Sequence, residues 1–475
     1  MQAYSYLRPS AVRDSTAGRA LALETSGGAT PAGEAANPHF FSGFLAAPTA
    51  AATALLAVAD VAAARYYRPN PSVRALLDPV VTADGDRLRF ESFSGCCGVY
   101  ARLDVLAPGL DGDDVGHGTT NVDVNLPLRR ALAGLGGLDP LHLTLGPEEL
   151  TVRTFDGEFV EKRVPLPERW LRGFAEAQVL AAGFGLRAEV PAAEAAAMLR
   201  ALPPPTRRSD ARTTRWVVPS GHTLRPTSRP APGAVCLPGP ERLLTLRTVL
   251  RHATTVRVYA PTAPAAADGT AAVAWEVGLP GMRLTLLLSP SAPRGFSGEG
   301  GVLHDLATGP AAADAERVGE LLAWEPRIDV AELSGRAGLS ADRVRAALTM
   351  LGTSGQIGYD LAEEAYFHRH LPYHLGAAET RNPRLRGARA LVANGSVRLD
   401  GTLARVGTGD DAHVVRTDKT SGELSCTCFW WAKYRGGRGP CRHVLAVGMV
   451  RGTAAAAEAT PNAARSKSAR SETAR

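Results

Sequence analysis

Three of the six cysteines of this 475-residue chain lie between positions 426 and 441, and a histidine follows the third. The group is Cys426, Cys428, Cys441 and His443. Alternate side chains of an extended strand point the same way, so the thiolates of Cys426 and Cys428 can converge on one ion. Glycines at 436, 437 and 439 allow the chain to reverse and bring the second pair back to the first. This spacing predicts a single four-ligand metal site.

The donor atoms predict the metal and its role. Three sulfurs and one imidazole suit tetrahedral zinc, and a filled shell of this kind leaves no position for a water molecule. We therefore expect one structural Zn2+ and no Lewis-acid catalysis at this site. The alternative, a chance cluster of reduced thiols, is disfavoured because both pair spacings and the apolar helix expected after Pro440 agree with a metal site.

The order Cys-x-Cys, a loop of about a dozen residues and Cys-x-His resembles the SWIM zinc finger, which occurs in bacterial proteins, chromatin-remodelling ATPases and plant transposases. The resemblance covers roughly Val397 to Val450, and all four ligand positions match. The whole chain is similar to bacterial SWIM zinc-finger family proteins, in which a long N-terminal region precedes the finger. Such fingers are thought to bind DNA or other proteins, so the resemblance implies a ligand set and leaves the partner open.

Basic and aromatic side chains alternate in the finger loop, and no Asp or Glu occurs between positions 429 and 451. The candidate nucleic-acid contacts are Lys433, Arg435, Arg438, Arg442, Trp430 and Trp431. Cations meet phosphates and bases stack on aromatic rings, so the pattern predicts binding of DNA or another nucleic acid. A second interpretation stays open, in which the rings form the core of a small zinc module and the cations are only solvated.

The distribution of charge also favours the C-terminal end of the chain as the place where a nucleic acid binds. The net charge is +6, and 49 of the 53 basic residues are arginines, a bias that also accompanies a GC-rich genome. Residues 371–475 carry a net charge of +9, so the first 370 residues carry −3 in total. We therefore expect any polyanion to bind near the C-terminal end.

Segments with helical and with strand-like periodicity alternate along the rest of the chain, which predicts a multidomain α+β fold. We expect a loosely structured leader at 1–35, an α+β domain at 36–185, a second α+β domain with a Pro-rich loop at 186–310, a winged-helix-like domain at 311–375, the zinc-finger domain at 376–451 and a disordered basic tail at 452–475. The order helix–strand–strand–strand occurs after position 127 and again after 243, which suggests a duplicated module.

The expected winged-helix segment consists of three helices and a hairpin. Its third helix, Ala341 to Leu351, presents Asp342, Arg343 and Arg345 outward. A helix that reads bases usually offers more hydrogen-bond donors, so this helix either contacts DNA or docks a protein partner.

Motifs for catalysis are absent from the sequence. It has no phosphate-binding Gly-x-x-x-x-Gly-Lys loop, no dinucleotide-binding fingerprint and no His-Glu-x-x-His. His117 lies between glycines in an expected turn without an assignable nucleophile or second base, and Cys96 and Cys97 are expected to be core thiols. We expect a protein that is not an enzyme, and the sequence identifies no small-molecule substrate; an enzyme centred on His117 stays a third hypothesis.

The longest apolar stretch, Phe44 to Ala63, consists mostly of Ala and Thr and contains Asp60, so it predicts a packed helix and no membrane span. With so few cysteines and no secretion signal, we expect a cytoplasmic protein without a membrane partner. The predicted function is a non-enzymatic nucleic-acid binding module acting through the finger. The alternative is a protein–protein adaptor that uses the finger and the winged helix without nucleic acid.

Overall fold

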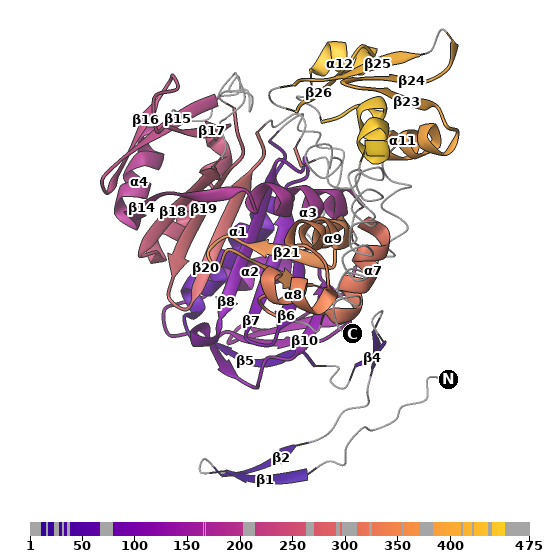
Figure 1. Cartoon of the computed structure of the whole chain (residues 1–475). Helices are drawn as coiled ribbons and strands as arrows, with labels where there is room; N and C mark the ends of the chain where they lie inside the picture. The colour runs from indigo at the N-terminus through magenta and orange to yellow at the C-terminus, as the bar shows by residue number, and fades with distance from the viewer. Residues whose placement is uncertain are drawn as a thin grey trace, which may run out of the picture.

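The fold is seen in a computed structural model of the chain (Figure 1). It describes residues 11–15, 18–22, 28–30, 33–35, 39–66, 79–164, 166, 168–202, 214–262, 270–290, 295–296, 311–322, 325–353, 355–369, 383–409, 412–419, 422–435 and 439–451. The tail expected at 452–475 and much of the expected Pro-rich loop lie outside these residues. In the expected leader, β1 (Ala11–Ser15) pairs with β2 (Gly18–Ala22), and β3 (Gly28–Thr30) pairs with β4 (Gly33–Ala35).

An eight-stranded antiparallel sheet forms the centre of the molecule, in the order β10-β6-β7-β8-β20-β19-β18-β14. At its middle, β8 and β20 pair from Val105↔Met282 to Val99↔Leu288. Strands from 36–185 and from 186–310 thus form one sheet, and the boundary expected at 185 falls inside β14. The strands are β6 (Val80–Asp84), β7 (Arg87–Phe93), β8 (Val99–Leu106), β10 (His117–Asn121), β14 (Phe184–Pro191), β18 (Thr255–Pro261), β19 (Val273–Leu279) and β20 (Met282–Leu288).

Alternation along these strands separates an apolar face from a charged one. In β8 and β20 the residues at 99, 101, 103 and 105 and at 282, 284, 286 and 288 belong to the largest hydrophobic core, and their neighbours point to the other face. Helices pack on the apolar side: α1 (Pro48–Ala63), α2 (Leu126–Gly134), α4 (Ala192–Ala201) and α5 (Leu246–Val249). The alanines of α1 let it lie close to β7 and β8, so the stretch expected to be a packed helix is one.

No helix in the described part of the chain is long and apolar enough to cross a membrane.

Two smaller sheets flank the central one. The five-stranded sheet has the order β13-β12-β11-β5-β9 and the three-stranded sheet the order β16-β15-β17. Their strands are β5 (Phe41–Leu45), β9 (Leu110–Gly112), β11 (His142–Leu145), β12 (Glu149–Thr154), β13 (Gly157–Lys162), β15 (Thr214–Ser220), β16 (Thr223–Thr227) and β17 (Val235–Pro238). The order helix–strand–strand–strand is present in α2 with β11–β13 and in α5 with β18–β20. That these segments are duplicates stays a prediction.

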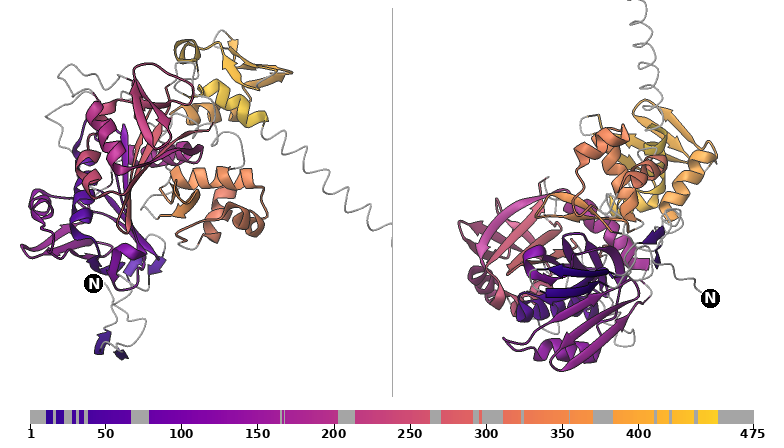
Figure 2. Two further views of the ribbon diagram at one scale, coloured as in Figure 1. Left: turned by 90° about the vertical axis from the view of Figure 1, so that its left-hand side faces the viewer. Right: turned by 90° about the horizontal axis from the view of Figure 1, so that it is seen from below.

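A helical unit lies on the other side of the large sheet from α1 (Figure 2). It consists of α7 (Ala311–Leu321), α8 (Val330–Ala337), α9 (Ala341–Thr353) and a hairpin of β21 (Ile357–Asp360) and β22 (Ala365–His368). The Asp329 side chain caps α8 by accepting from the backbone N–H of Ala331 and Glu332, and Gly338 ends that helix at φ +61°. The element order is the one expected for 311–375, and the winged-helix assignment stays a prediction.

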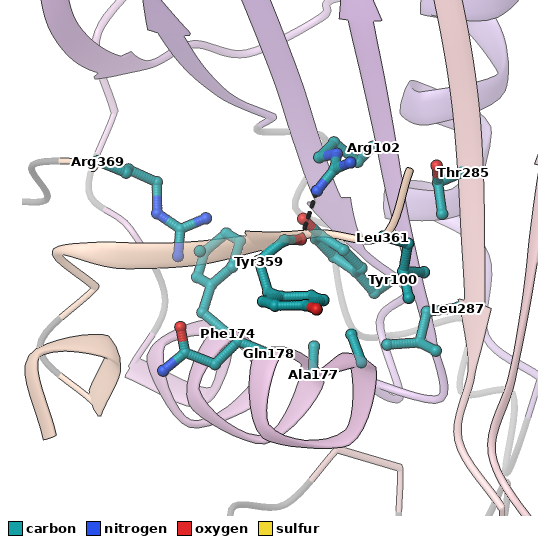
Figure 3. Close-up of a pocket in the computed structure, with 12 residues that line it drawn as sticks. Tyr100, Arg102, Phe174, Ala177, Gln178, Thr285, Leu287, Tyr359, Leu361 and Arg369 are labelled. Atoms are coloured by element: carbon teal, nitrogen blue, oxygen red, sulfur yellow. Dashed lines mark hydrogen bonds between the residues drawn. The ribbon is translucent and has the colours of Figure 1, made fainter. Parts of the chain in front are cut away.

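The hairpin and α3 (Glu168–Ala181) cover the charged face of the large sheet (Figure 3). Arg102 donates to the carbonyl oxygen of Tyr359 at 2.7 Å. Asp360 lies 3.2 Å from Arg102, 3.0 Å from Arg283 and 3.6 Å from Arg89; Asp360, Arg102 and Arg89 are buried, and Arg283 is partly buried. Burial alone raises the pKa of Asp360, but these arginines outweigh it and hold the pKa below its usual range. The hairpin is therefore attached to the sheet by buried ion pairs.

The C-terminal domain is a four-stranded sheet in the order β23-β24-β25-β26 with helices on one face. Ala404, Val406 and Val415 point from the sheet into a core shared with Leu385 and Val444 of those helices. The elements are α11 (Pro383–Ala393), β23 (Val397–Asp400), β24 (Leu403–Val406), β25 (His413–Thr417), β26 (Leu424–Cys426), α12 (Phe429–Tyr434) and a helix at 442–451.

Candidate metal centre

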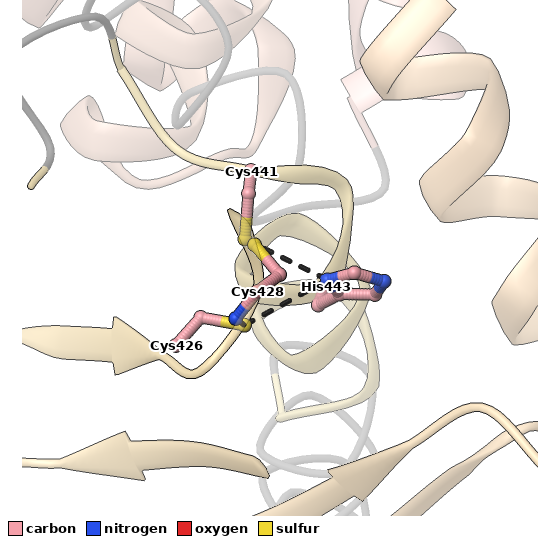
Figure 4. A group of neighbouring side chains, drawn as sticks. All are labelled: Cys426, Cys428, Cys441 and His443. Carbon is pink, nitrogen blue, oxygen red and sulfur yellow. Dashed lines mark hydrogen bonds between the residues drawn. The ribbon is translucent and has the colours of Figure 1, made fainter. Parts of the chain in front are cut away.

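The four predicted ligands come from the ends of three elements (Figure 4). Cys426 ends β26, Cys428 is the N-cap of α12, and Cys441 and His443 lie at the start of the helix at 442–451. Backbone N–H groups aim at the sulfurs: Trp431 N–H donates to Cys428 Sγ at 3.5 Å, and Val444 N–H donates to Cys441 Sγ at 3.5 Å. These donors stabilise thiolates, which are the form that binds metal.

The geometry of the cluster fits zinc. The four donor atoms lie within 4.8 Å of one another, and all four residues are buried. His443 Nδ1 lies 3.7 Å from Cys426 Sγ and 4.0 Å from Cys441 Sγ. Tetrahedral zinc, with bonds of about 2.3 Å to sulfur and about 2.0 Å to nitrogen, separates its ligands by about 3.5 to 3.8 Å. Nδ1 is therefore the ligating nitrogen, and the cluster fits one structural zinc ion.

The thiols of the cluster affect one another's acidity. Hydrogen bonding with Cys426 lowers the pKa of Cys441 to about 4, and the same contact raises the pKa of Cys426. Burial raises the pKa of Cys428. A metal ion held by the three sulfurs would favour the thiolate form of each.

The predicted cations of the finger lie on its surface. Lys433 and Arg435 are exposed at the C-terminal end of α12, where Arg435 adopts the left-handed conformation with φ +42°. Arg442 is exposed next to the zinc ligands, and its Nε lies 3.2 Å from His443 Nε2. Arg438 lies outside the described residues.

The two tryptophans occupy the core of the finger. Trp430 is half-buried, with Arg384 at 4.5 Å from its ring and Tyr434 at 4.6 Å between ring centroids. Its indole nitrogen donates to Gly439 O at 3.4 Å. Trp431 is also half-buried and packs against the hydrophobic core of the finger. Arg384 and Tyr434 thus occupy part of the space beside the ring of Trp430 in which a base would stack.

Phe429 is an exposed aromatic residue that is not among the nucleic-acid contacts predicted from the sequence. It has 79% of its surface exposed, and Lys433 Nζ lies 5.8 Å from its ring centroid. The spacing of four residues places both side chains on one face of α12. The sequence contains a signal for this exposure. In a helix that begins at Cys428, Trp430 and Trp431 face the core and Phe429 faces away from it.

The cations of α9 are paired with acids. Arg343 donates to both carboxylate oxygens of Asp314, at 2.6 and 2.9 Å, and Arg345 donates to Asp342 at 2.9 Å. The sequence predicts that these side chains point outward, but it does not indicate that Asp314 on α7 pairs with Arg343. Phosphates would have to compete with carboxylates for them.

The other candidate residues lie far from the metal centre. Cys97 is buried, and burial raises the pKa of its thiol to about 11, as suits a core residue. Cys96 is partly buried and lies beside the Ser94 hydroxyl, with 3.5 Å between sulfur and oxygen. His117, expected in a turn, instead begins strand β10 opposite Asp84, and burial lowers its pKa.

Comparison with known proteins identifies the finger. Residues 415–447 match the family model of the SWIM zinc finger, and the four ligands lie within that range. The C-terminal domain therefore contains a SWIM zinc finger. No curated protein matches the chain.

Solved structures resemble the chain only distantly. The Proliferating Cellular Nuclear Antigen from Entamoeba histolytica is 10% identical with a TM-score of 0.33, over 53% of this chain and 98% of that one. A PCNA2–PCNA3 complex from Sulfolobus tokodaii is 9% identical with a TM-score of 0.35, over 53% and 99%. The C. crescentus beta sliding clamp is 16% identical with a TM-score of 0.34, over 52% and 64%. TM-scores this low do not define the fold.

Proposed function

We propose that this protein is a non-enzymatic nucleic-acid binding module that binds DNA through its zinc finger. The observation that carries the proposal is an acid-free segment with exposed cations beside a buried metal centre. From position 429 to 451 no acidic residue occurs, and Lys433, Arg435 and Arg442 are exposed there. Cations without competing carboxylates attract phosphates.

Each side chain has a distinct part in this proposal. Lys433, Arg435 and Arg442 contact phosphates, and Arg438 belongs to the same loop of the sequence. Phe429 supplies the ring on which a base stacks. Trp430 and Trp431 maintain the shape of the finger. Zinc, when bound, ties β26 and α12 to the helix at 442–451 and takes part in no reaction. We place the protein in the cytoplasm, where thiols stay reduced and available to zinc.

A salt titration tests the proposal. The zinc-loaded chain is titrated with labelled single- and double-stranded DNA, and the logarithm of affinity is plotted against the logarithm of salt concentration. We expect a linear decrease, with a slope that falls by about one for each cation removed in Lys433→Ala/Arg435→Ala. The matched control is Arg225→Ala/Arg229→Ala, which removes two exposed cations of the three-stranded sheet region. Equal slopes for wild type and the finger variant would refute the proposal.

A protein adaptor is the second candidate, and the paired cations of α9 favour it for the helical unit. Arg343 and Arg345 are engaged by Asp314 and Asp342, so α9 presents a surface of nearly balanced charge. Such a surface suits a protein partner better than a polyanion. If the titration detects no DNA binding even at low salt, the adaptor function replaces the first proposal.

A further inference from the structure

The sheet of the finger domain has one face without covering helices. Burial alternates along β24, where Ala404 and Val406 are buried and Leu403 and Arg405 are exposed. Cross-strand partners lie on the same face of a sheet. The register therefore assigns one set of side chains to the open face: Arg398, Asp400, Leu403, Arg405, Val414, Arg416 and Ser425.

Two arginines of this face are direct neighbours. Arg398 on β23 pairs with Arg405 on β24, and Arg405 pairs in turn with Val414 on β25. Directly opposite side chains have Cβ atoms about 4.5 to 5.5 Å apart, and like charges in such positions destabilise a sheet. Within the described residues, no ion pair involves Arg398, Arg405 or Arg416. An anion above the sheet would relieve this repulsion.

The cross-strand row of Arg398, Arg405 and Val414 leads toward the metal centre. Val414 and Thr427 exchange two hydrogen bonds: Val414 N–H donates to Thr427 Oγ1 at 3.0 Å, and Thr427 N–H donates to Val414 O at 3.1 Å. Thr427 directly precedes Cys428, the N-cap of α12. The row of Arg398 and Arg405 therefore ends where α12 begins.

Among the described residues of this domain, the acids lie toward the opposite end of the strands. Asp400 ends β23 beside the turn to β24, and Asp418 and Glu423 lie in the turn between β25 and β26. In the sequence, Asp410 and Asp411 fall in the connection between β24 and β25 and lie outside the described residues.

We propose that Arg398 and Arg405 form a second phosphate-binding surface that extends the finger and holds the sugar–phosphate backbone of a nucleic acid. The proposal rests on the function proposed above. The apolar side chains of this face are the aliphatic Leu403 and Val414, so it offers no ring for stacking, and its contribution is independent of base sequence. A nucleic acid is favoured over an acidic protein because the row continues to α12, whose exposed Phe429 ring can stack on a base.

The test is the double variant Arg398→Ala/Arg405→Ala of the full zinc-loaded chain. We expect its salt slope on DNA to be smaller than that of wild type by about one to two, with the same loss on oligo-dT and on a mixed sequence. Arg398→Lys/Arg405→Lys should keep the slope, because it keeps both charges. Zinc content and thermal unfolding of each variant verify that it folds. Arg225→Ala/Arg229→Ala serves again as the matched control.

The outcomes separate the two proposals. If wild type binds no nucleic acid, the proposed function and this inference both fail. If wild type binds, Lys433→Ala/Arg435→Ala lowers the slope and Arg398→Ala/Arg405→Ala does not, only the inference is overturned. If the arginine pair affects binding of polyglutamate and has no effect on DNA, the surface binds acidic protein and the inference is likewise overturned.

Discussion

Glu161 shows how a single side chain can weaken a fold that otherwise places charges in pairs. It is 4% exposed on β13, and its Oε1 atom has no hydrogen-bond partner in the described structure. Burial raises its pKa to about 7, the nearby Asp123 adds to the rise, and the backbone N–H of Asn125 opposes it. Because the folded-state pKa exceeds the ordinary 4.5, the folded chain binds more protons than the unfolded chain. Stability therefore decreases as the pH rises from about 4.5 through 7.

Replacing this carboxyl by an amide removes the cost of ionising it. We expect Glu161→Gln to raise the free energy of unfolding by about 1 to 2 kcal/mol at pH 8, after allowance for solvent screening, and to have little effect near pH 4.5. Urea unfolding at both pH values measures the difference, with the exposed Glu149→Gln on β12 as control. A variant that gains nothing at pH 8 would show that Glu161 ionises at its ordinary pKa.

At the scale of elements, the sequence predicts what is local and misses what is distant. The spacing of Cys426, Cys428, Cys441 and His443 is enough to define the metal site, because strand alternation and a short loop bring them together. The pairing of β8 with β20 joins segments more than 170 positions apart, and neither segment carries a signal for the other. The charged residues of the large sheet alternate as in a half-exposed strand, yet the hairpin at 357–368 buries them.

The hairpin depends on Asp360, which offers one prediction at this scale. Asn at this position leaves the buried Arg89 and Arg102 and the partly buried Arg283 with less negative charge beside them. Breaking a buried ion pair by removing one partner costs about 3 to 5 kcal/mol, so we expect Asp360→Asn to release β21 and β22 from the sheet. Hydrogen exchange should become faster at 357–368. Asp400→Asn, at an exposed position, should leave exchange there unchanged, and unchanged exchange in Asp360→Asn would contradict the ion-pair attachment.

At the scale of the whole molecule, the zinc finger and the large sheet have separate sources of stability. The large sheet holds a hydrophobic core of its own with α1, α2, α4 and α5. The finger has a small sheet, and its buried residues include the ligands Cys426, Cys428 and Cys441. Small zinc modules are usually unfolded without metal, since binding and folding are coupled there.

Removal of zinc should therefore unfold one part of the chain and spare the other. We expect metal analysis to find one zinc per chain, and Cys428→Ser or excess chelator to reduce it to near zero. Hydrogen exchange should then become fast at 397–451, while β8 and β20 keep their protection. Cys96→Ser, which removes a thiol outside the finger, should keep its zinc. A finger that stays protected without metal would mean that its hydrophobic contacts suffice for folding, and DNA binding should then survive chelation.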